Sequence, residues 1–181
     1  MQLNKRTVFQ MNTIKRSIFK AVIWYTIVML CISMVLNSFS IILGLLKGEI
    51  GTIFTAIFSL IFFLIFFFIA IKLLKEQNTK KTFYIVLLFW IAQVVFFGIK
   101  GNAYAFTSGP QIAIYFRYVG SFEFDVLLRY WSQELSFDIN TVSDRIYFGL
   151  NLIPLLISLT LIYIYKENQQ LQKALDKEDN S

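Results

Sequence analysis

The chain has 181 residues, of which 57% are hydrophobic and 18% aromatic, and its formal net charge is +6. A soluble domain of this length could not bury so many apolar side chains, so the composition predicts a protein with much of its surface in lipid. The positive charge indicates attraction to anionic lipid head groups, and nothing in the sequence calls for a nucleic-acid partner.

Cysteine and histidine usage restricts the chemistry. The chain has one cysteine, Cys31, and no histidine. A single cysteine cannot form an intrachain disulfide, and without histidine the chain lacks the commonest metal ligand and the usual general base near neutral pH. No pairing of a nucleophile with a base and no metal-ligand spacing is present among the carboxylates. We therefore expect no enzymatic activity, no metal and no cofactor.

Four uncharged apolar blocks follow one another along the chain, at residues 21–45, 50–71, 83–99 and 146–165. Each is close to the roughly 20 residues that a helix needs to cross the hydrocarbon layer. The blocks are continuously apolar, whereas strands of a membrane barrel would alternate apolar and polar residues. The sequence predicts an all-α integral membrane protein, a bundle of four transmembrane helices that forms a single polytopic domain over residues 1–181.

The basic residues give this predicted bundle an orientation. Most of the Lys and Arg residues flank the blocks on one side, in residues 1–20, 72–82 and 166–181. The positive-inside rule places that side, with both termini, in the cytoplasm, and residues 100–145 outside. The small size and the lack of a eukaryotic targeting signal favour the plasma (inner) membrane of a bacterium.

The outer region, residues 100–145, admits two structures. In the first, residues 112–118 and 122–128 alternate around Gly120 and Ser121, a pair suited to a hairpin turn, and residues 135–139 add a third strand of a β-meander. In the second, Ser121 caps an interfacial helix with Phe124 and Trp131 on its apolar face. The many β-branched and aromatic residues in 111–126 favour the meander.

Three carboxamides lie inside the apolar blocks: Asn37, Gln93 and Asn151. A carboxamide in hydrocarbon costs several kcal/mol unless it finds hydrogen-bond partners, so we expect all three to face the bundle interior in one polar layer of its outer half. Such a layer is most often a hydrogen-bond network that fixes helix register. The functional alternative is a polar cavity that opens outward under residues 100–145.

The sequence thus supports two hypotheses about function. The first is a non-enzymatic multi-pass membrane protein that acts through interaction, as an accessory, assembly or sensing component. Its partners would be the lipid bilayer and a second membrane protein or another copy of the chain. The second is a small oligomeric transport or channel component that uses the polar layer.

Overall fold

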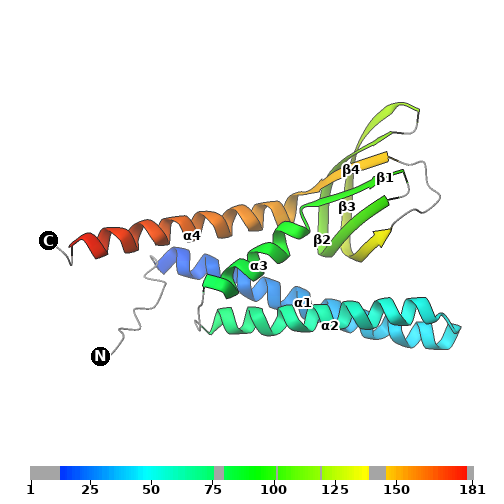
Figure 1. The fold of residues 1–181 in the computed structure, drawn as a ribbon, viewed down its shortest axis with the longest axis horizontal. Helices are drawn as coiled ribbons and strands as arrows, with labels where there is room; N and C mark the ends of the chain where they lie inside the picture. Colours follow the sequence, from blue (N-terminus) through cyan, green and yellow to red (C-terminus); the bar gives the residue numbers. More distant parts are fainter. Residues whose placement is uncertain (1–12, 76–79, 101, 119, 139–145, 179–181) are drawn as a thin grey trace.

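A computed structural model describes residues 13–75, 80–100, 102–118, 120–138 and 146–178. Three helices, four strands and a fourth helix follow one another along the described residues (Figure 1). In order they are α1 (Thr13–Lys47), α2 (Ile50–Leu74), α3 (Lys80–Ala92), β1 (Val95–Ile99), β2 (Asn102–Tyr118), β3 (Phe122–Asp138), β4 (Ile146–Asn151) and α4 (Leu152–Glu178).

The first two apolar blocks form a long antiparallel helical hairpin, α1–α2. The chain reverses at Gly48, whose φ of 70° suits glycine, and Thr52 Oγ1 donates a hydrogen bond to Glu49 Oε2 at 3.1 Å in the first turn of α2. By length and composition alone, two described helices could cross a membrane, Lys15–Lys47 and Ile50–Leu74. A buried core helix or a signal sequence would pass the same test.

The predicted all-α bundle of four transmembrane helices is wrong, because the other two blocks are each part helix and part strand. Block 83–99 contains most of α3 and then β1, and block 146–165 contains β4 and then the first part of α4. An uninterrupted apolar run does not distinguish a helix from a buried strand. Aromatic and β-branched residues favour the strand at Val95 and Phe96, and Pro154 lies in the first turn of α4, where its missing N–H breaks no helical bond.

The outer region forms one long hairpin, and the interfacial helix is wrong. The turn lies where the sequence predicts it, since Tyr118 pairs with Phe122 and Gly120 has a φ of 80°. The strands are much longer than predicted, with 17 residues each. Residues 135–138 belong to β3 itself, and residue 139 lies outside the described residues. The meander of three short strands is therefore replaced by β2 and β3, with β1 and β4 completing an antiparallel sheet.

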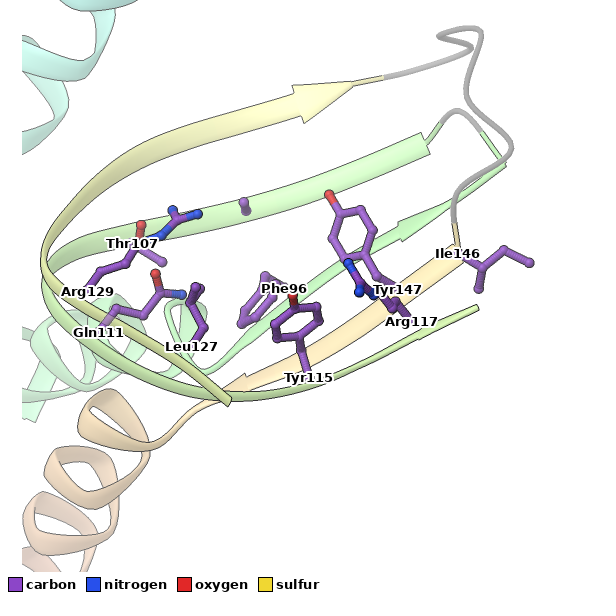
Figure 2. A pocket seen from close by; sticks show the side chains of 10 residues that line it. Phe96, Thr107, Gln111, Tyr115, Arg117, Leu127, Arg129, Ile146 and Tyr147 are labelled. Atoms are coloured by element: carbon purple, nitrogen blue, oxygen red, sulfur yellow. The ribbon is translucent and has the colours of Figure 1, made fainter. Parts of the chain in front are cut away.

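The pairing pattern requires β2 to bend back on itself. Both β1 and β4 pair antiparallel with β2, at its beginning and its end respectively, and yet they are antiparallel to each other. A straight β2 would make them parallel. The bend lies at Gly109, whose φ is 117°, and there β3 carries one extra residue between Arg129 and Ser132. The sheet therefore curls into a cup, which Figure 2 shows from close by.

The base of the cup rests on a helical core. Trp90 and Phe63 are fully buried in this core, and Trp90 Nε1 donates a hydrogen bond to Thr26 Oγ1 at 3.0 Å. Phe106 of β2 joins the core, with its ring centroid 5.5 Å from that of Phe89. The α1–α2 hairpin runs on past the end of α3, alongside the cup (Figure 1).

Candidate functional site

The concave side of the cup encloses a cavity of about 590 Å³ (Figure 2). All four strands contribute side chains to its wall. They are Phe96, Ala105, Thr107, Gln111, Tyr115, Arg117, Leu127, Arg129, Ile146 and Tyr147. Because side chains alternate along a strand, the odd-numbered residues from Gln111 to Arg117 face the cavity and the even-numbered ones face outward.

Two aromatic rings form the apolar part of this wall by packing onto glycines of the neighbouring strand. Phe96 is paired with Gly149, and Tyr147 is paired with Gly98. A Cβ atom at Gly149 would overlap the Phe96 ring, and one at Gly98 would overlap the Tyr147 ring. The absence of a side chain at both glycines therefore lets the rings cover the strands and makes room for the cavity.

At one end of the cavity, two cross-strand pairs hold polar groups in place. Arg117 Nε donates a hydrogen bond to Glu123 Oε2 at 2.6 Å, and Tyr115 Oη donates one to Asp125 Oδ2 at 3.1 Å. The hydrogen bond with Glu123, followed by the attraction of its charge, raises the pKa of Arg117 further above its ordinary value. Arg117 therefore stays charged, and the N–H groups of both Nη atoms are not used by this bond.

The other end of the cavity holds Thr107, Gln111 and Arg129 (Figure 2). Gln111 is only 4% exposed, and its Oε1 has no hydrogen-bond partner among the described residues. Thr107 is already paired, through a 2.8 Å hydrogen bond with Ser132 Oγ. No ion pair of Arg129 is found in the part of the chain that the structure describes. Arg129 itself is exposed, so the unusual group here is the buried Gln111 carbonyl, since buried polar groups are normally paired.

Two of the three predicted layer residues, Asn37 and Gln93, are linked by hydrogen bonds. Gln93 Oε1 accepts a bond of 2.8 Å from the backbone N–H of Ser108. Ser108 Oγ is 2.7 Å from Ser33 Oγ, and Asn37 Nδ2 donates to the Ser33 carbonyl at 2.9 Å. Asn37 and Gln93 are 6% and 1% exposed. This chain of bonds ties α1 to the bend of β2 and to the residue after α3.

Asn151, the third layer residue, lies at the junction of β4 and α4. It is 2% exposed, and its backbone N–H donates to the Val94 carbonyl at 2.7 Å, next to Gln93 in sequence. Its side-chain Oδ1 has no partner among the described residues. None of the three layer residues is among the side chains that line the cup cavity.

A second hollow of about 580 Å³ lies between α1 and α2. It is lined by Asn37, Ser40, Gly51, Thr52, Thr55, Ala56, Ser59 and Phe63. Several of its hydroxyls are bonded within their own helices, since Ser40 Oγ donates to the Leu36 carbonyl at 3.1 Å and Thr55 Oγ1 to the Gly51 carbonyl at 3.0 Å. These hydroxyls are already satisfied, so this groove makes weaker demands on a ligand than the cup does.

Arg117 and Arg129, like the other cup residues, were not predicted as site residues from the sequence. The signal that could have found them is the alternation in 111–117 and 123–129, which places the polar side chains on one face of the hairpin and the apolar ones on the other. The bend at Gly109, which closes that polar face into a cavity, has no comparable signal.

Comparison of the chain with protein-family models, with curated proteins and with solved structures finds no match in any of the three.

Proposed function

We propose that this chain is a non-enzymatic, membrane-anchored binding protein, and that its cup binds a small anionic ligand with an apolar body. The observation that carries the proposal is that Gln111, whose buried carbonyl has no hydrogen-bond partner among the described residues, lies opposite Arg129 in the strand register at one end of the cavity. A ligand that brings an anionic group and an N–H or O–H donor would satisfy both. Its apolar part would lie against Phe96 and Leu127, in a cavity of a size usual for small-molecule sites.

The exposure of α1 and α2 supports the membrane anchor. Only 33% of the most apolar stretch of α1 and 22% of that of α2 are buried within the protein, whereas the core helix of a soluble protein would be mostly buried. The side chains left exposed on α2 include Phe54, Phe58 and Phe68. Since water is a poor solvent for such a surface, lipid is the environment that suits it.

The same proposal includes an orientation. Lys72, Lys75 and Lys80 lie at the end of the helical hairpin where α2 finishes and α3 begins. The positive-inside rule puts this end in the cytoplasm of a bacterial cell, and the Gly48 turn and the mouth of the cup then face outward across the plasma membrane. A binding site on that side suits a sensing or accessory role.

The binding proposal is tested with hippurate, which combines a carboxylate, an amide N–H and an aromatic ring. Isothermal titration uses the full chain in phosphatidylcholine nanodiscs, with two matched compounds. Hippuramide lacks the charge, and N-acetylglycine lacks the ring. We expect hippurate to bind more tightly than either compound, because only hippurate offers a charge for Arg129, an N–H for Gln111 and a ring for the apolar wall. Equal affinities for hippurate and hippuramide would reject an anion site.

Arg129→Gln tests the residue on which the proposal depends. An ion pair made by an exposed arginine contributes about 0.5–1 kcal/mol, so the variant is expected to weaken hippurate binding by about 2- to 5-fold. Lys47→Gln removes the same charge from the far end of α1 and serves as the control, with unchanged affinity expected. If both variants bind hippurate as the unmodified chain does, the cup is not the site.

The groove between α1 and α2 favours a second candidate, a small oligomeric transport or channel component. Asn37, Thr55 and Ser59 would line a polar path there. Single cysteines at Thr55 and Ser59, in a chain without Cys31, would then react with a water-soluble thiol reagent in proteoliposomes. Failure of both cysteines to react would leave no water-accessible path at this groove.

A further inference from the structure

We infer that the convex face of the cup, formed by β2 and β4, lies in the outer leaflet of the membrane and contacts lipid acyl chains. The inference rests on the proposed anchoring of α1 and α2 in a bilayer, and it adds a lipid-facing surface that neither helix provides. It follows from three features of the sheet: its polarity, its depth and the pairing of its edges.

The outer face of the sheet is apolar, unlike that of a soluble protein. The charged and polar side chains of the sheet, such as Gln111 and Arg117, point into the cup, where they share the wall with apolar residues such as Phe96 and Leu127. On β2 and β4 the exposed outward residues are Ile112, Phe116, Tyr118 and Phe148, and Phe116 is 49% exposed. On β3 they are Phe122, Phe124, Val126, Leu128 and Tyr130. An apolar outer face, with the polar side chains gathered inside, is the pattern of strands surrounded by lipid.

The depth of the sheet follows from helix lengths. The 25 residues of α2 rise about 37 Å, enough to cross about 30 Å of hydrocarbon, whereas the 13 residues of α3 rise only about 20 Å. Both helices have lysines at the same end of the molecule, so α3 ends well inside the bilayer that α2 crosses. The chain then continues directly into β1. Contact between Phe106 and Phe63, midway along α2, places the base of the cup at the same depth.

Backbone pairing decides which part of the sheet suits hydrocarbon. Over residues 113–118, β2 has β3 on one edge and β4 on the other, and β4 pairs with both β1 and β2. Their N–H and C=O groups are therefore satisfied within the sheet, as lipid requires. In contrast, β3 pairs only with β2 among the described residues, so its outer edge is less suited to lipid. The inference is accordingly confined to the convex face of β2 and β4.

The test compares neighbouring residues that point to opposite sides of β4. Spin labels are attached to Phe148→Cys, on the convex face, and to Tyr147→Cys, inside the cup, in a Cys31→Ala chain in phosphatidylcholine vesicles. Collision with oxygen, which concentrates in lipid, is measured against collision with a water-soluble nickel complex. We expect the label at 148 to favour oxygen by several-fold over the label at 147. Phe116→Cys provides the same measurement on β2 if Phe148→Cys does not fold.

A label at Phe58→Cys on α2 separates this inference from the proposed anchor. If 58 is in lipid while 148 and 116 meet the nickel complex, the helical hairpin is anchored and the lipid-facing sheet is refuted. If 148 and 116 are shielded from both reagents, protein and not lipid covers this face, which also overturns the inference. If 58 itself meets the nickel complex, the anchor fails and the inference fails with it. Hippurate binding remains a separate measurement throughout.

Discussion

At the scale of single residues, the cup depends on positions where a side chain is missing or unsatisfied. Gly98 and Gly149 make room for the rings that line the cavity, and Gln111 brings a buried carbonyl without a partner among the described residues. An unpaired buried acceptor costs about 1–3 kcal/mol, which a ligand bearing a donor would recover on binding. The Gln111 carbonyl, which costs folding free energy while it lacks a partner, would thus favour binding of the ligand.

Gly149→Ala tests the contact between glycine and ring. The new Cβ would overlap the Phe96 ring, and such overpacking costs about 1–3 kcal/mol, so the free energy of unfolding should fall by that amount. Denaturant unfolding in detergent micelles measures it. Gly51→Ala is the control, because a Cβ there has no neighbour within 4 Å and alanine favours a helix. Equal effects of the two substitutions would mean that the ring does not pack on Gly149 as described.

At the scale of elements, the α1–α2 hairpin and the β2–β3 turn were predictable, because each rests on a local pattern. The apolar run of residues 50–71 and the Gly48 turn are of this kind, as is the alternation on either side of Gly120. The division of blocks 83–99 and 146–165 into helix and strand was not predictable. It depends on pairing between β1 and β4, which are about 50 residues apart, and no window of 20 residues contains that information.

The candidate site was less predictable than the fold. Asn37, Gln93 and Asn151 stood out because carboxamides are rare in apolar runs, and the structure places all three in buried positions. Arg117 and Arg129 did not stand out, because arginine in a segment outside the predicted membrane spans is ordinary. Only the bend of β2 brings these two arginines to one cavity, and a bend depends on the whole sheet.

Gln93→Leu tests how the junction between helices and sheet is held. The substitution keeps the volume but leaves the buried Ser108 N–H without its acceptor, which should cost about 1–3 kcal/mol of the free energy of unfolding. Thermal unfolding, followed by circular dichroism, measures the loss. Hippurate affinity should be unchanged, since Gln93 is outside the cup cavity. A variant as stable as the unmodified chain would argue against this hydrogen bond.

The contact between α1 and α4 should make stability depend on pH. Lys15 donates a hydrogen bond to Glu167, and this bond lowers the pKa of Glu167. Because the folded-state pKa is depressed, the stabilisation is present above the ordinary glutamate value of about 4.3 and is lost as the pH falls through the lowered value. Unfolding midpoints of the unmodified chain and Glu167→Gln should therefore converge below that value. A difference between them that did not vary with pH would contradict the pairing.

At the scale of the whole molecule, the α1–α2 hairpin and the cup lie beside each other and differ in character. The α1–α2 hairpin is apolar on its outer surface, and the cup beside it is apolar outside and holds both polar and apolar side chains inside. The shorter α3 connects the hairpin to β1, so the cup begins where α3 ends, beside the middle of α2 (Figure 1). In a bilayer, this arrangement would hold a polar binding cavity in the outer half of the membrane, open to the side away from the lysines.

The central claim is that the α1–α2 hairpin crosses a bilayer with its turn outside, and labelling in intact cells tests it most directly. Single cysteines replace Glu49, at the turn, and Lys75, at the opposite end of α2, in a chain without Cys31. An impermeant thiol reagent should label the cysteine at 49 in intact cells, and the cysteine at 75 only after the membrane is opened. Labelling of both positions in intact cells, or of 75 alone, would contradict the account.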